Sequence, residues 1–386
     1  MFPTLGHLIN YLFGTNINFP MPTYGFILVM AFATSGIVLN MAFRRKERLG
    51  ELKSHKSKEL VSGPINYFDL LFTAFFYFII FYKIVGVMFD YDTFTKDINA
   101  YIFSLQGNIV AGVLAAIGGF AFSFFNAKKK FSEIPIYNEV DILPHQITIN
   151  IVMIAALSGI VGAKLFDILE NLESFMKDPL DQLFSTGGFT FYGGLILGTL
   201  SVGIYIRKRG ISILQMLDSG APAILAAYAV GRMACMLSGD GCWGIPNPEP
   251  QPEWLVFLPD WMWAYDFPHN VIKEGVQISG CNGEYCYMLD VPVFPTPFYE
   301  SSLSALFFLI VWFVQNKIKA PGTMFFIAIG LNGIARFFIE KIRVNNEYHI
   351  GGGITQAEII SSLLVVTGIV GIVVLHRMYK RKTKVY

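Results

Sequence analysis

The chain has 386 residues, of which 54% are hydrophobic and only 15% are charged, and its formal net charge at pH 7 is +1. This composition, with a mean hydropathy of +0.51, excludes a soluble globular protein and is typical of a polytopic membrane protein. A near-neutral net charge gives no indication of a nucleic-acid partner, and we expect none.

Nine apolar segments are predicted to cross the membrane as helices, so the expected fold class is all-α. The loops after the odd-numbered segments hold most of the chain's 29 Lys and Arg residues, and the positive-inside rule therefore places them in the cytoplasm. This assigns the N-terminus to the outside and the C-terminus to the cytoplasm. The predicted segments are 22–43, 66–89, 108–126, 147–167, 189–206, 213–237, 298–316, 321–341 and 355–376.

The domain organisation follows from these segments. We expect residues 1–376 to form a single transmembrane domain, followed by a basic cytoplasmic tail at 377–386. The outward loop 238–297 is large enough for a small folded cap, and its Pro, Trp and Tyr residues suit the membrane surface. Within this cap a disulfide between Cys281 and Cys286 is the simplest pairing in an oxidising compartment, and free thiols are the open alternative.

The stretch from Gly231 to Gly244 is the most informative in the chain. It places a cation, Arg232, a hydroxyl, Ser238, and an acid, Asp240, where an apolar segment ends. Ionisable residues at such a place indicate a functional site, and the glycines allow the backbone to approach a ligand closely. The alternative is a simple helix C-cap with Arg232 extending to the membrane surface.

Several other polar residues lie at the outer ends of predicted spans, and their common depth is the argument for a shared site. Arg336, Glu340 and Arg343 follow i, i+4, i+7 spacing, which lines them along one helix face. Each of the others has a purely structural alternative, such as an aromatic belt, an ion pair, small-residue packing or a dipole partner. They are Tyr24, Lys164, Tyr192, Gly193, Gly194 and Glu300.

Arginines at the level of the outer leaflet suit an anionic phospholipid headgroup, because guanidinium groups match phosphate oxygens bidentately. The six histidines are scattered, and no HxxxH or CxxC pairing occurs, so the sequence predicts no metal site. A transporter would also explain charges within the membrane, but no inverted repeat is visible.

The order of these motifs resembles that of the prolipoprotein diacylglyceryl transferase family of bacterial inner-membrane enzymes. The resemblance covers the first span and most of 158–376, while 66–146 adds two helices to the family's seven-helix core. It rests on Tyr24-Gly25, Gly162 to Asp167, Phe191 to Ile196, Asp218 to Pro222, Gly231 to Gly244, Pro297 to Glu300, Ala335 to Glu340, and Thr355-Gln356.

The resemblance implies transfer of the diacylglyceryl group of phosphatidylglycerol to the lipobox cysteine thiol of preprolipoproteins. A thioether forms, glycerol phosphate leaves, and no cofactor is needed. The implied partners are phosphatidylglycerol, preprolipoprotein signal peptides with a lipobox cysteine, and membrane lipids. The implied location is the bacterial inner (cytoplasmic) membrane, with several spans and the active site and the 238–297 cap on the periplasmic side.

The resemblance also suggests roles for individual residues. We predict that Arg232 and Arg336 hold the phosphate, that Glu340 orients Arg336, and that Arg343 lies at the outer rim. The family's usual histidine is replaced by Tyr192 and a usual asparagine by Cys235, so Asp240 is our first choice of base and Tyr192 the second. A family member with altered or lost catalysis is the alternative. Further substrate contacts are predicted for Tyr24, Lys164, Gly193, Gly194, Ser238, Tyr299 and Glu300.

Overall fold

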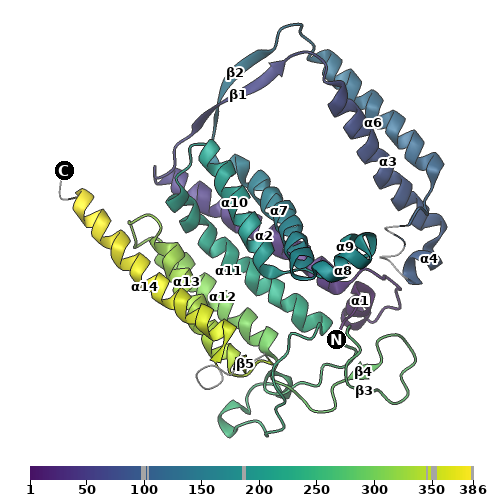
Figure 1. Cartoon of the computed structure of the whole chain (residues 1–386), viewed down its shortest axis with the longest axis vertical. Helices are drawn as coiled ribbons and strands as arrows, with labels where there is room; N and C mark the ends of the chain where they lie inside the picture. Colours follow the sequence, from purple (N-terminus) through teal and green to yellow (C-terminus); the bar gives the residue numbers. More distant parts are fainter. Residues whose placement is uncertain (97–100, 102–103, 185–187, 345–346, 349–353, 384–386) are drawn as a thin grey trace. The chain divides into compact units, whose positions relative to one another are not determined.

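The computed structural model describes residues 1–96, 101, 104–184, 188–344, 347–348 and 354–383. The chain divides into two compact units. The first unit comprises 1–53, 144–157 and 198–386, and the second comprises 54–143 and 158–197. Figure 1 shows the elements of both units in the colours of the sequence.

Each of the nine predicted spans contains a helix. Among the described residues, eight helical segments are long and apolar enough to cross a membrane, which confirms a polytopic all-α membrane protein. The helix expected as the fifth span, α10, is not among the eight. Its glycines and its terminal Arg207 and Lys208 lower its hydropathy. The nine helices are α2 (Thr23–Arg48), α3 (Tyr67–Phe89), α6 (Ile109–Lys129), α7 (Thr148–Glu170), α10 (Phe191–Lys208), α11 (Ile213–Ser238), α12 (Thr296–Val314), α13 (Thr323–Glu340) and α14 (Gln356–Thr383).

The shorter elements connect these helices. The strands pair as three two-stranded antiparallel sheets, β1 with β2, β3 with β4 and β5 with β6. The sequence analysis did not predict these strands. The short elements are α1 (Leu5–Phe13), α4 (Tyr91–Lys96), α8 (Leu172–Lys177), α9 (Pro179–Phe184), η1 (Pro144–Ile147), η2 (Glu253–Leu255), η3 (Asp260–Met262), β1 (His55–Ser62), β2 (Ile136–Ile142), β3 (Val276–Gln277), β4 (Tyr287–Met288), β5 (Glu347–Tyr348) and β6 (Ile354–Thr355).

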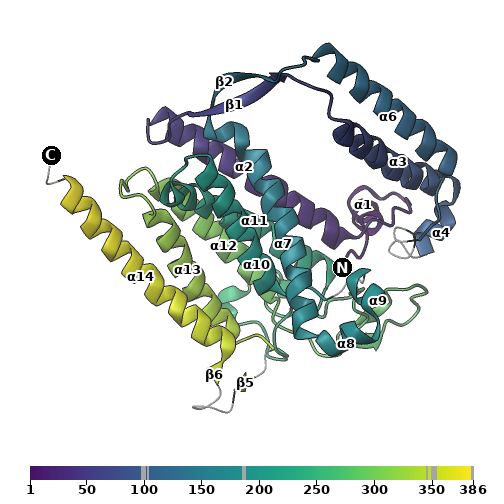
Figure 2. The ribbon, with the colours of Figure 1, turned by 45° about the horizontal axis from the view of Figure 1, so that its top comes forward.

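In the first unit, α11 is the central helix. It packs against α2 and also against α12 and α13, while α14 packs against α13, as Figures 1 and 2 show. Two serines of α12 bind the backbone of α11: Ser301 Oγ donates to Ala229 O and Ser304 Oγ donates to Leu225 O, each at 2.8 Å. Hydroxyl and small side chains at the interface let helices approach closely in an apolar environment. The buried cluster between α11, α12 and α13 consists of Ala221, Leu225, Val311, Met324 and Ala328.

A buried acid joins α11 to the start of α13. Asp218 Oδ2 accepts the N–H of Gly322 at 2.7 Å, and its Oδ1 accepts the N–H of Met324 at 2.9 Å. Lys46 Nζ lies 3.5 Å from the same Oδ2. A carboxylate at a helix N-terminus satisfies N–H groups that have no partner within the helix. Asp218 is therefore a structural cap.

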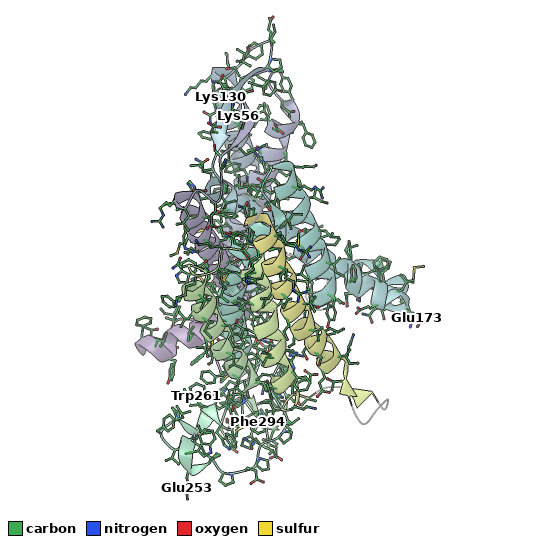
Figure 3. The ribbon with its side chains drawn as sticks, turned by 90° about the vertical axis from the view of Figure 1, so that its left-hand side faces the viewer. Lys56, Lys130, Glu173, Glu253, Trp261 and Phe294 are labelled. Carbon is green, nitrogen blue, oxygen red and sulfur yellow. A yellow bond between two sulfur atoms is a disulfide. The ribbon has the colours of Figure 1, made fainter. Side chains whose placement is uncertain are left out.

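Residues 239–295 form a folded cap beyond the end of α11. Trp243, Phe267, Leu289 and Val293 pack with Met236, which anchors the cap to the helix. Figure 3 shows Glu253, Trp261 and Phe294 at this same end of the first unit. Cys281 and Cys286 are joined by a disulfide, the simplest pairing that the sequence suggested.

The second unit contains the pair of helices α3 and α6, which extends from the two-stranded β1–β2 sheet. Gly112 and Gly119 of α6 lie against the rings of Phe78 and Tyr77 on α3. The Nζ of Lys83 donates to three backbone carbonyls of the following loop, at 2.6 to 2.9 Å. A cation within an apolar helix is thus satisfied by the main chain.

Candidate active site

A buried carboxylate on α12 lies at the centre of an arginine cluster. The Glu300 side chain is only 5% exposed, and its Oε1 lies 3.1 Å from Arg336 Nη1 and 3.4 Å from Arg343 Nη1. Its Oε2 forms a third ion pair with Nε of Arg232. One carboxylate therefore gathers cations from α11, from α13 and from the segment after α13.

Helix geometry explains the position of Glu300 on α12 and the contacts of Arg336 on α13. Because α12 begins at Thr296, two residues before the predicted start of this span, Glu300 lies in its second turn. On α13, Arg336 Nη2 pairs with Glu340 Oε2 at 2.9 Å, the contact expected from i,i+4 spacing. The Thr355 hydroxyl donates to Glu340 Oε1 at 3.0 Å. Arg336 is therefore held by two acids, one on its own helix and one on α12.

The chain after α11 runs beside the chain after α13. Ile245 N–H donates to Ile342 O at 2.9 Å, and Gly244 forms an antiparallel bridge with Arg343. A Cβ at Gly244 would lie 2.9 Å from Cβ of Phe294, so only glycine permits this approach. The same bridge brings Arg343 into the cluster, where its side chain is 19% exposed. Arg343 is thus the member of the cluster that lies beyond the end of α13.

The sequence analysis did not identify Tyr228 as part of the cluster. Arg232 Nε donates to Tyr228 Oη at 3.1 Å, and the guanidinium carbon lies 5.5 Å from the centre of the ring. The two residues are four apart on α11, so helical spacing placed them on one face. Tyr228 therefore helps to orient the Arg232 guanidinium.

The cluster has an excess of positive charge. Its three guanidinium groups are matched by the carboxylates of Glu300 and Glu340, which leaves one cation unbalanced. A pocket beside the cluster is lined by Glu300 and Arg336 together with apolar Leu303, Phe307 and Ile339. The excess positive charge of the cluster suits an anionic ligand such as a phosphate.

Other predicted site residues belong to the second unit. Lys164 is buried on α7, where its Nζ lies 3.4 Å from Gly188 O and 5.0 Å from the centre of the Phe189 ring. Tyr192, at the start of α10, is 44% exposed. Both residues belong to the second unit, whereas the arginine cluster belongs to the first.

Gly193 and Gly194 serve helix packing in the second unit. A Cβ at Gly194 would lie 2.9 Å from Gly159 O, and a Cβ at Gly193 would overlap the Phe166 side chain. The structure thus gives both glycines the packing role that was the alternative to substrate contact.

Two further residues that were predicted to contact the substrate form hydrogen bonds within the protein instead. Ser238 is fully buried, and its hydroxyl donates to Ala234 O at 2.8 Å, so it does not face a ligand. The Tyr299 hydroxyl donates to Met262 O at 2.7 Å and thereby ties α12 to the cap. Both residues were expected to contact the lipid, and their hydrogen-bonding groups are instead engaged by the backbone.

A group of sulfur and oxygen atoms lies at the tip of α11, next to the arginine cluster. The Sγ atoms of Cys235 and Cys242 and a carboxylate oxygen of Asp240 lie within 4.8 Å of one another. Arg232 Nη1 donates to Cys235 Sγ at 3.6 Å. Tyr24, at the start of α2, is close enough to interact electrostatically with Arg232 and with the three residues of this group. This group has the spacing C-x4-D-x-C, which is neither HxxxH nor CxxC, so the sequence analysis did not identify it.

The two thiols interact with each other. A hydrogen bond from Cys235 lowers the pKa of Cys242 to about 7, and the positive charges of Arg232 and Arg343 act in the same direction. Burial and the Asp240 carboxylate oppose this shift. Asp240 Oδ1 accepts the backbone N–H of Cys242 at 3.2 Å, which holds the turn together.

Comparisons with known proteins point to one family. The family model described as prolipoprotein diacylglyceryl transferase matches residues 109–374, which includes every arginine of the cluster but not Tyr24. A phosphatidylglycerol–prolipoprotein diacylglyceryl transferase of Clostridium botulinum strain 657 is 29% identical over 263 residues, covering 67% of this chain and 90% of the relative.

Two other relatives carry the same name. One, from Clostridium botulinum strain Hall, is 30% identical over 223 residues, covering 57% of this chain and 77% of its own length. Another, from Leptospira interrogans serovar copenhageni, is 30% identical over 222 residues, covering 50% of this chain and 61% of its own length. Since the family model spans more than half of the sequence, the chain belongs to the prolipoprotein diacylglyceryl transferase family.

Proposed function

We propose that this protein transfers the diacylglyceryl group of phosphatidylglycerol to the lipobox cysteine thiol of preprolipoproteins. The observation that carries the proposal is the cluster of three arginines around Glu300 in a member of this family. The thiol sulfur attacks the glyceryl carbon that bears the phosphate, a thioether bond forms, and the carbon–oxygen bond to glycerol phosphate breaks.

The arginines act on the departing phosphate. Arg232 and Arg336 donate to its oxygens, and Arg343 adds a third charge. Each guanidinium has five N–H donors, so groups that pair with Glu300 keep further donors for a phosphate. Preorganised cations stabilise the charge that develops on the leaving group, and Glu340 holds Arg336 in position.

The acceptor thiol must lose a proton, because the thiolate is the nucleophile. Asp240 is our first candidate for the base, since it lies at the tip of α11 beside the sulfur atoms, one of which accepts from Arg232. Tyr192 is the second candidate. A neutral phenol is a weaker base than a carboxylate, which favours Asp240.

We place the reaction at the outer face of the bacterial cytoplasmic membrane, with the N-terminus outside and the C-terminal tail, 377–386, inside. This orientation is supported by the basic residues, because most of them lie in the loops that it places in the cytoplasm. In this arrangement residues 1–376 form one transmembrane domain, and 66–146 is an addition to the family core. The 238–297 cap lies over the site and controls access of the lipoprotein.

The experiment is transfer of labelled phosphatidylglycerol to a lipobox peptide by the purified protein in lipid vesicles. We expect product from the wild type, none from Arg232→Ala, and wild-type rates from Arg377→Ala, an exposed arginine of α14. Comparing Asp240→Asn with Tyr192→Phe identifies the proton acceptor by the larger loss.

Absence of product from a folded wild type that still binds the phospholipid would contradict the proposal. It would favour the alternative of a lipid-binding family member with altered or lost catalysis. Flux of a substrate across sealed vesicles without any transfer would instead favour a transporter.

A further inference from the structure

The strongest unassigned feature is the group formed by Cys235, Asp240 and Cys242. Cys235 lies in the last turn of α11, and Gly239 then reverses the chain with φ 66°. Gly241 continues the turn with φ 87°. Residues with positive φ at both positions bring the next two ligands back to the helix end. The backbone itself therefore assembles the three side chains.

We propose that Cys235, Asp240 and Cys242 bind a thiophilic divalent cation such as Zn²⁺, and that the acceptor cysteine of the lipoprotein supplies the fourth ligand. The proposal rests on the function proposed above and names how its thiol substrate is held. It assigns to this group a role that the sequence did not predict.

The ligand chemistry fits the cation. Two thiolates and one carboxylate are ligands that Zn²⁺ accepts, and their donor atoms already lie within 4.8 Å of one another. Three protein ligands leave one position of a tetrahedral ion open, which is the arrangement of catalytic rather than structural sites. An incoming cysteine thiol is suited to that open position.

A neighbouring cation offsets part of the ligand charge. Two thiolates, one carboxylate and the acceptor thiolate carry four negative charges, of which a divalent cation neutralises two and a neighbouring guanidinium offsets a third. Arg232 is placed to do this, because its Nη1 donates to Cys235 Sγ at 3.6 Å. Groups that donate to ligating atoms orient them and tune the metal. Asp240 Oδ1 accepts the N–H of Cys242, which restrains the carboxylate in the same way.

Arg232 also links this group to the phosphate cluster, since the same side chain pairs with Glu300. The sulfur acceptor and the phosphate leaving group would therefore lie on two sides of one guanidinium. Holding both reactants beside a shared residue lowers the entropic cost of bringing them together.

The chemical step balances without an oxidant or reductant. The acceptor thiol releases its proton to solvent as it binds the cation, because a coordinating thiol is deprotonated. The bound sulfur then forms a bond to the glyceryl carbon, and the carbon–oxygen bond breaks with its electron pair leaving on glycerol phosphate, which takes up a proton. The cation takes over the role of base that was proposed above for Asp240, so Asp240→Asn should lose metal binding together with transfer.

The test uses the full chain in lipid nanodiscs, stripped with a chelator and titrated with Zn²⁺, and with Cd²⁺ as a spectroscopic probe. We expect one ion per chain and a thiolate-to-metal charge-transfer band with Cd²⁺. Cys235→Ser, Cys242→Ser and Asp240→Asn should each weaken binding by more than about tenfold, since even loss of an outer-shell partner costs that much. The matched control is the double variant Cys281→Ser/Cys286→Ser, which should bind the ion as the wild type does.

A second arm tests the open position. A lipobox peptide should increase the charge-transfer band, and the same peptide with serine in place of cysteine should not. Chelation should lower transfer at least tenfold, and Zn²⁺ should restore it. Transfer that is unchanged by chelation would overturn the proposal while leaving the proposed function intact.

Two other outcomes are equally decisive. A Cys235–Cys242 disulfide in the active protein, detected by mass spectrometry, would overturn the metal site. Metal binding and the peptide response without transfer from any phospholipid would retain the site and count against the proposed function instead.

Discussion

Two buried carboxylates in the first unit are held in different ways. Asp218 accepts two backbone N–H groups at the start of α13 and pairs with Lys46. Glu300 instead pairs with the side chains of three arginines. Backbone donors are fixed by the helix, whereas guanidinium groups have further N–H donors for another anion. A buried acid satisfied by the main chain is thus a structural element, while one that gathers side-chain cations prepares an anion site.

The largest effect is expected for Glu300→Gln. A neutral amide cannot hold three like charges together, so the arginines should move apart and lose their preorganisation. Transfer rates should fall by about 10² to 10³, the usual result of removing one preorganised electrostatic contribution. Initial rates of diacylglyceryl transfer in vesicles provide the measurement. A wild-type rate in this variant would show that Glu300 is only structural.

The matched change at the other carboxylate, Asp218→Asn, should act on stability and not on chemistry. Removing one partner of a buried, hydrogen-bonded ion pair costs about 3 kcal/mol. Denaturation in mixed micelles should detect this loss, while the rate per folded molecule stays close to that of the wild type. Reduced activity with unchanged stability would erase the distinction between the two acids.

Arg336→Lys should have an intermediate effect. Lysine keeps the charge but not the planar fork that reaches both Glu300 and Glu340. We expect transfer to fall roughly tenfold, the equivalent of one charge-assisted hydrogen bond. Kinetics against phosphatidylglycerol concentration would test this, and a loss as large as that of Arg336→Ala would mean that charge alone is insufficient.

Thr355→Val should have the smallest effect. It removes the hydroxyl that donates to Glu340 Oε1 and so relaxes the support behind Arg336. The expected cost is about 1 kcal/mol of stability. Ser362→Ala is the control, because its hydroxyl donates to Glu358 O on the same helix. Equal losses in both variants would argue against a specific role for Thr355.

The sequence was most informative where the relevant pattern is local. The apolar stretch 213–237 predicted α11 to within one residue, because each span must supply its own apolar length. The Arg336–Glu340 pair was equally accessible, since helical spacing puts the two residues on one face. Short strands such as β3 and β4 escaped prediction because two residues carry no periodicity.

The site was harder to predict where its members are distant in the sequence. Glu300 was identified as a candidate, but its partners Arg336 and Arg343 lie 36 and 43 residues away, so its central position was not visible. The group of Cys235, Asp240 and Cys242 was not predicted, because its side chains meet only after Gly239 turns the chain back.

The amino-acid sequence alone determined the class of the molecule, the position of its long helices and the motifs of its family. Each of these depends on one segment at a time, since the thickness of the bilayer constrains every span independently. Only the tertiary structure decided which polar groups meet. Ser238 is buried, Arg343 pairs with Glu300, and Glu300 lies at the centre of the arginine cluster. The sequence could not show this, because contacts between helices depend on the packing of all their neighbours.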